Sequence, residues 1–73
     1  MYQLPVVIEK DEDGYYAYCP SLEGCQTQGD TYEEILFNIK EAIFLYISTL
    51  SETEKNEILK KDTTTILVGV QVA

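Results

Sequence analysis

The sequence contains no histidine, arginine or tryptophan, and its only cationic side chains are five lysines. Thirteen acidic residues give a formal net charge of −8 at pH 7. Without histidine, a His general base, a Ser-His-Asp triad and imidazole ligation of a metal are excluded. The shortage of cations argues against direct nucleic-acid binding, because such binding needs cations that displace the counterions of phosphate. The composition instead predicts an acidic protein whose partner is a basic protein.

Long hydrophobic runs are also absent. The first five residues show neither the basic region nor the apolar region of a signal peptide, and no stretch is long enough to span a bilayer. We therefore expect a cytoplasmic protein without membrane contact. Cys19 and Cys25 are expected to be free thiols that pack as small hydrophobic side chains, because a reducing compartment disfavours disulfides. A disulfide between them in an exporting context is the alternative.

The chain is short, with 73 residues and a mass of 8.3 kDa. This length allows a single domain over residues 1–73 and excludes two domains with separate cores. A hydrophobic content of 45% is typical of a globular chain and too high for a disordered tail. Because a domain of this size buries only about 60% of its unfolded surface, self-association would stabilise it. We expect a homo-oligomer.

Alternating apolar residues predict a β-hairpin at the start of the chain. Residues 2–10 and 15–19 form its two strands, and the turn lies at residues 11–14. In this register Ile8 faces Ala17 on the core side, with Val6 opposite Cys19. The open side is expected to carry Val7, Glu9, Tyr16 and Tyr18.

The remaining elements are a short strand over residues 25–29, a helix over 31–50, a short polar helix or turn over 52–61 and a final strand over 63–73. Both helices begin with capping-box spacing, Thr31 with Glu34 and Ser51 with Glu54. The apolar stripe of the long helix consists of Tyr32, Ile35, Leu36, Ile39, Ile43, Tyr46, Ile47 and Leu50.

Connection rules turn these elements into an α+β fold, a two-layer β-β-β-α-β sandwich. The first three strands form a meander, and a right-handed helical crossover delivers the last strand beside the first, in the order 3-2-1-4. The long helix covers one face of the sheet. The other face stays open, and Leu67 of the last strand joins Val7, Tyr16 and Tyr18 on it.

Phe37 and Phe44 lie seven residues apart on the long helix, more than about 100° from the centre of its apolar stripe. Two large aromatic rings on the outer flank of a helix are unusual in a small monomer. We predict that they contact a partner or a second copy. The alternative is that residues 51–61 fold back over them.

Three other patterns point to chemistry only weakly. Residues 11–14 begin like a calcium loop, but the later ligands are missing, so a solvated turn is expected. The tyrosines of the hairpin could stack on bases, but no arginine accompanies them. Glu9, Glu41 and Asp62 could serve a two-metal nuclease, but Glu9 points to the open face and the helix lies on the other. We therefore expect neither an enzyme nor a cofactor.

The sequence resembles the HicB family, the antitoxins of HicA–HicB toxin–antitoxin pairs. The resemblance rests on the opening strand Leu4–Glu9, on Asp13–Ala17, and on the loop Pro20-Ser21-Leu22-Glu23-Gly24-Cys25. It continues through Thr27–Thr31, Glu33-Glu34 and the helical segment Asn38–Ile43. The Pro-x-x-x-Gly-Cys loop followed by a Gly-Asp cap and this helix is a fairly specific combination.

The resemblance implies a partial ribonuclease-H-like fold and a small basic HicA-like toxin as the partner, an mRNA-cleaving ribonuclease whose active site the antitoxin blocks. The acidic turn would then face the toxin through Glu9, Asp11, Glu12 and Asp13. Many family members add a C-terminal DNA-binding domain. This sequence ends with the predicted last strand, so we expect no such domain and no operator binding. The alternative function is a stand-alone oligomeric interaction protein of the same fold without a toxin.

Overall fold

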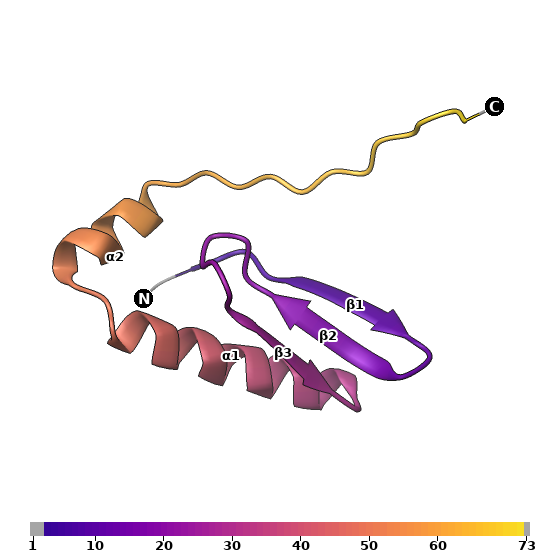
Figure 1. Ribbon diagram of the computed structural model, residues 1–73, viewed down its shortest axis with the longest axis horizontal. Helices are drawn as coiled ribbons and strands as arrows, with labels where there is room; N and C mark the ends of the chain where they lie inside the picture. The colour runs from indigo at the N-terminus through magenta and orange to yellow at the C-terminus, as the bar shows by residue number, and fades with distance from the viewer. Residues whose placement is uncertain (1–2, 73) are drawn as a thin grey trace.

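Three strands and two helices follow one another along the chain in the computed structural model, which describes residues 3–72. They are β1 (Val7–Asp11), β2 (Gly14–Tyr18), β3 (Gln26–Gly29), α1 (Tyr32–Ser48) and α2 (Glu52–Leu59). Figure 1 shows α1 lying along the sheet, α2 beyond the far end of α1, and an extended C-terminal tail. The predicted α+β class is confirmed.

The β1–β2 hairpin has the register that the sequence predicts. Ile8 pairs with Ala17, and the following pair joins Glu9 and Tyr16. The tight turn requires Gly14, whose φ is +130° and whose missing Cβ would lie 2.9 Å from the carbonyl oxygen of Gly29. β1 begins at Val7, so residues 3–6 of the predicted strand are not part of it, in keeping with Pro5, which has no backbone N–H to donate. Residue 2 of the predicted strand lies outside the described residues.

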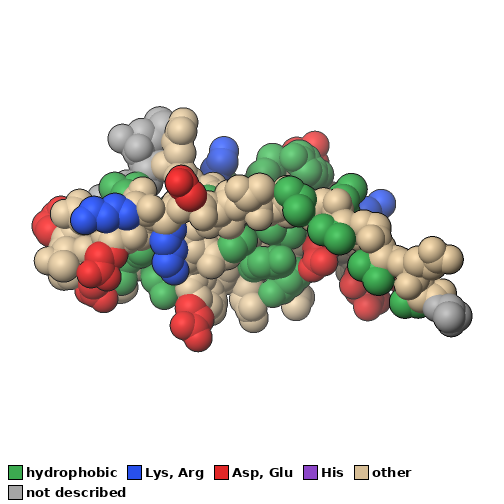
Figure 2. All heavy atoms as spheres, turned by 90° about the horizontal axis from the view of Figure 1, so that it is seen from above, with side chains coloured by type: hydrophobic (Ala, Val, Ile, Leu, Met, Phe, Trp, Pro, Cys, Tyr) green, Lys and Arg blue, Asp and Glu red, His purple; other side chains and the backbone are tan. Residues whose placement is uncertain are grey.

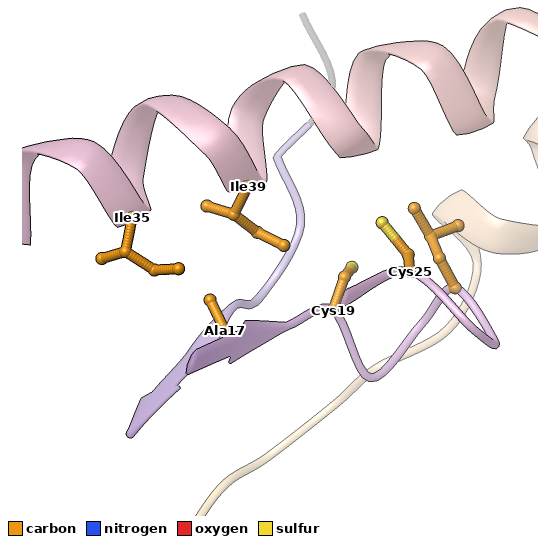
Figure 3. Packing of buried hydrophobic residues seen from close by; sticks show 6 residues of the cluster. Ala17, Cys19, Cys25, Ile35 and Ile39 are labelled. Atoms are coloured by element: carbon orange, nitrogen blue, oxygen red, sulfur yellow. The ribbon is translucent and has the colours of Figure 1, made fainter. Parts of the chain in front are cut away.

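The core lies between the sheet and α1. Its fully buried members are Ala17, Cys19, Leu22, Cys25, Ile35 and Ile39. Figure 3 shows the two isoleucines pointing from α1 toward the strand that carries Ala17. The loop between β2 and β3 closes this core from one end, because the Cys19 N–H donates to the Cys25 carbonyl at 3.0 Å and holds Leu22 inside.

Both helices begin at their predicted caps. The Thr31 hydroxyl accepts a hydrogen bond from the Glu34 N–H at 3.1 Å. At α2 the capping box is complete. The Ser51 side chain accepts a hydrogen bond from the Glu54 backbone N–H, and the Glu54 side chain accepts one from the Ser51 backbone N–H. Of the eight residues predicted for the α1 stripe, only Ile35 and Ile39 are fully buried. The reason is the small sheet: α1 packs chiefly over β3 and β2, so the stripe's later residues are only partly covered.

The predicted fourth strand is not formed. In the described part of the chain the sheet has three strands in the order β1-β2-β3, not four in the order 3-2-1-4. Residues 63–72 are extended but pair with no strand, and Ala73 lies outside the described residues. Leu67 is fully exposed on this tail and does not lie on the open face of the sheet. Alternation shows that a segment suits a strand, but a strand also needs a partner edge within reach.

Candidate interaction surfaces

The face of the sheet opposite α1 carries a tyrosine patch, defined here as Val7, Tyr16 and Tyr18. All three side chains are half-buried. The two tyrosine rings lie with centroids 5.8 Å apart, and the Tyr16 hydroxyl donates to Oε1 of Gln26 at 2.8 Å. The predicted division of the hairpin into a core side and a tyrosine side is therefore present. Two packed rings, one of them with a hydrogen-bonded hydroxyl, form an amphipathic surface of the kind that protein interfaces often use.

An acidic end lies beside this patch, where β1 turns into β2. Glu9, Asp11, Glu12 and Asp13 are all exposed there. Oδ1 of Asp11 accepts the Asp13 N–H at 2.8 Å, so the turn is ordered by its own side chain.

A hollow of about 350 Å³ opens at the acidic end. Its lining consists of Asp11, Asp13, Gly14, Tyr15, Tyr16, Gln28, Gly29 and Asp30. Sequence reasoning missed Asp30, although the antiparallel pairing of β3 with β2 sets Gly29 opposite Tyr15, next to the turn. The residue after β3 must then lie at the same end of the sheet. Tyr16 belongs to both the hollow and the tyrosine patch, so the two surfaces are continuous.

An apolar groove of about 500 Å³ runs between the N-terminal segment and the two helices. Its lining consists of Leu4, Lys40, Ile43, Phe44, Ile47, Ser48 and Lys55. The groove thus holds two of the five lysines, and its charge differs from that of the acidic end.

The two phenylalanines on α1 are both exposed, Phe37 by 66% and Phe44 by 68%. The alternative that residues 51–61 cover both rings is therefore wrong. Phe44 lines the apolar groove and Phe37 does not, so the two rings belong to different surroundings on the helix. Their role as an interface stays a prediction.

The two cysteines are free and buried, as predicted. Burial raises the pKa of the Cys25 thiol, and the neighbouring Cys19 raises it further. A raised pKa keeps the thiol protonated at neutral pH and so lowers its reactivity. Both residues serve the core as small apolar side chains.

Within residues 3–72, no three His, Cys, Asp or Glu side chains lie close enough together to hold a metal ion. Glu9, Glu41 and Asp62 accordingly form no such group. Neither helix of the described chain has the length and apolarity needed to cross a membrane.

Taken together, the fold and surfaces define a class: a small acidic α+β domain with a one-sided sheet and exposed apolar surfaces suited to contact other proteins. Within this class, the chain belongs to the family of HicB-like antitoxins of bacterial toxin–antitoxin systems, which it matches over residues 4–68. The resemblance identified from the sequence is thereby confirmed. No solved protein structure gives a significant match.

Relatives occur in both bacteria and archaea. A UPF0150 protein of Helicobacter pylori is 48% identical over 67 residues, which cover 92% of this chain and 90% of the relative. A UPF0150 protein of Synechocystis is 49% identical over 63 residues, covering 85% of this chain and 78% of the relative. One of Thermoplasma acidophilum is 53% identical over 58 residues, with coverages of 78% and 81%.

Proposed function

We propose that this chain is an antitoxin domain that binds a small basic, mRNA-cleaving, HicA-like toxin and occludes its active site. The observation that carries the proposal is the family match over residues 4–68. The net charge of −8 supports it, because an acidic protein attracts a basic one over distances of about a Debye length and accelerates its binding.

The acidic end is the proposed contact with the toxin. An RNA-cleaving protein must hold phosphates, so its active site is lined with cations. The exposed carboxylates of Glu9, Asp11, Glu12 and Asp13 could pair with those cations and compete with RNA. Asp30 adds a further carboxylate to the lining of the hollow.

The tyrosine patch extends the proposed contact with apolar area. Charged residues alone give specificity and rate more than affinity, whereas buried aromatic side chains often dominate binding energy. Because Tyr16 lines the hollow and its ring packs against that of Tyr18, one partner could cover both surfaces at once.

The test takes any small basic protein that is encoded next to this gene, purifies it with the chain and assays it for RNA cleavage. We expect the wild-type chain to abolish cleavage at a one-to-one ratio. Asp11→Asn/Asp13→Asn should weaken inhibition, and Glu52→Gln/Glu57→Gln should not, since these carboxylates lie on α2 away from the hollow. Both doubles change the charge by the same amount. Undiminished cleavage with the wild-type chain would contradict the proposal.

A stand-alone oligomeric interaction protein is the second candidate. The exposure of Phe37 and Phe44, together with the apolar tail, favours it. A chain that self-associates through these residues but binds no neighbouring basic protein would support this second function.

A further inference from the structure

The C-terminal tail, residues 63–72, has the alternating side chains of a β-strand but pairs with no strand of the described sheet. It contains no charged residue, and Ile66, Val68, Val70 and Val72 alternate with Leu67, Gly69 and Gln71. Its large apolar side chains are between 69% and 103% exposed. One hydrogen bond among the described residues links the tail to the rest of the molecule. It joins the hydroxyls of Ser21 and Thr63, whose oxygens lie 3.5 Å apart.

The tail also leaves the body of the molecule. Figure 1 shows it running away from α2 as a long extended trace, and Figure 2 shows its hydrophobic side chains on the surface. The radius of gyration is 14.3 Å. A compact domain of this length has a radius of about 11 Å. Water therefore surrounds a ten-residue segment with five large apolar side chains, which a small domain normally avoids.

The outer edge of β1 has free backbone groups with which the tail could pair. Because β1 is the first strand in the order β1-β2-β3, one side of Val7–Asp11 has no neighbour in the described sheet. Unpaired N–H and C=O groups on such an edge accept an added strand. The edge is five residues long, and residues 68–72 match that length.

The surface next to this edge is apolar as well. Since α1 packs chiefly over β3 and β2, the apolar groove comes near the start of β1 through Leu4, which lines it with Ile43 and Ile47. Two lysines, Lys40 and Lys55, also line the groove. A strand added to β1 would place one row of its side chains on this side of the sheet. The apolar row Ile66, Val68, Val70 and Val72 suits that position.

We infer that the tail of each chain adds to the free β1 edge of a second copy, so that two chains exchange their tails in a symmetric dimer. Reciprocal exchange satisfies both edges and leaves no tail exposed, as a closed two-fold interface requires. The uncharged tail also lets two molecules of net charge −8 meet through a segment that adds no repulsion.

The apolar area is sufficient for a stable dimer. Ile66, Val68, Val70 and Val72 are exposed on each tail. Burying such a side chain removes roughly 60–120 Å² from water, so two tails remove on the order of 500–1,000 Å². The surfaces that they cover contribute a similar amount. The total reaches the 1,200–2,000 Å² or so of a specific interface.

Sedimentation of the full chain at micromolar concentration is the first test, and we expect a species of twice 8.3 kDa. Two single variants, Val68→Pro and Gly69→Pro, then probe the pairing. Only alternate N–H groups of a strand face its neighbour, so one proline should raise the dissociation constant about tenfold and the other much less. Val68→Ile, which keeps the N–H group, the strand propensity and the apolar surface, should leave dimerisation within about threefold.

A mixture of isotopically labelled and unlabelled wild-type chains shows whether the tail contacts β1 of its own chain or β1 of the second copy. Contacts between the tail of one copy and β1 of the other, seen in isotope-filtered spectra, are expected. A monomer at micromolar concentration, tail contacts only within one chain, or a dimer equally indifferent to both prolines would overturn the inference. Should the proline variants unfold, the labelled wild-type measurement decides alone.

Discussion

The β1–β2 hairpin and the C-terminal tail have similar sequence patterns and different fates. Both alternate apolar side chains with polar or small ones. The hairpin folds because a short turn brings its second strand to the first and sets the register. The tail follows two helices, has no local partner and stays exposed. An alternating pattern therefore shows that a segment can form a strand. Whether it pairs within its own chain depends on a nearby turn that brings a second strand beside it.

The largest expected difference in stability is between a substitution in the packed core and one in the tail. Ile39→Ala should lower the free energy of unfolding by about 2–5 kcal/mol, because Ile39 is only 1% exposed and its removal leaves a cavity. Val70→Ala, at a side chain that is 76% exposed, should change the stability of the monomer by less than about 0.5 kcal/mol. Urea unfolding at low protein concentration measures both. Equal losses would show that the tail belongs to the core of the monomer.

Residues with short-range partners account for what the sequence could predict. The turn at Gly14 and the caps at Thr31 and Ser51 act within four residues, so their elements begin where the patterns place them. The partner of the tail lies far away in the sequence, and the pattern at residues 63–73 carries no information about it. The acidic hollow was half predicted, since Asp30 joins it only through the pairing of β3 with β2.

The turn itself gives the next largest effect. Gly14→Ala should destabilise the fold by about 1–3 kcal/mol, because a Cβ would strain the backbone at φ +130° and would lie 2.9 Å from the Gly29 carbonyl oxygen. Gly69→Ala is the matched control, since nothing lies within 4 Å of its Cβ position. Thermal unfolding followed by circular dichroism compares the two. A Gly14→Ala variant as stable as the control would refute the role of this turn.

The cap of α2 should matter less. Ser51→Ala removes one partner of the capping box and should lower stability by about 0.5–2 kcal/mol. These hydrogen bonds also lower the pKa of Glu54 from its ordinary value of 4.5. The contribution of Glu54 is therefore present above pH 4.5 and is lost as the pH falls through its folded-state pKa. Acid titrations of the two proteins should differ in this range, and identical profiles would contradict the assigned cap.

Alkaline pH should weaken the packed region through Cys25. Because its pKa is raised in the folded state, the unfolded chain loses the proton first, and the stability due to this thiol is present below about pH 9.0 and falls as the pH rises further. Chemical unfolding between pH 8 and pH 11, in roughly unit steps, should show a steeper decline for wild type than for Cys25→Ala. The comparison removes any pH dependence that the two proteins share. Parallel declines would count against a buried thiol.

The exposed phenylalanines should have the smallest effect on folding. Phe37→Glu/Phe44→Glu should stay within about 0.5 kcal/mol of the wild-type monomer, since both rings are about two-thirds exposed. Contact with a partner or a second copy should weaken if they form an interface. Circular dichroism and sedimentation separate the two effects. A folded variant that keeps its oligomer size and its toxin binding would remove these residues from the interface.

Amide hydrogen exchange of the hairpin and the tail, measured on the full chain across protein concentrations, tests the contrast most directly. Hairpin amides should be protected at every concentration, because their partner strand is in the same chain. Amides of residues 65–72 should exchange freely in dilute monomer and gain protection as the dimer forms, together with those on the outer edge of β1. Protection of the tail in dilute monomer, or no protection at any concentration, would contradict the account.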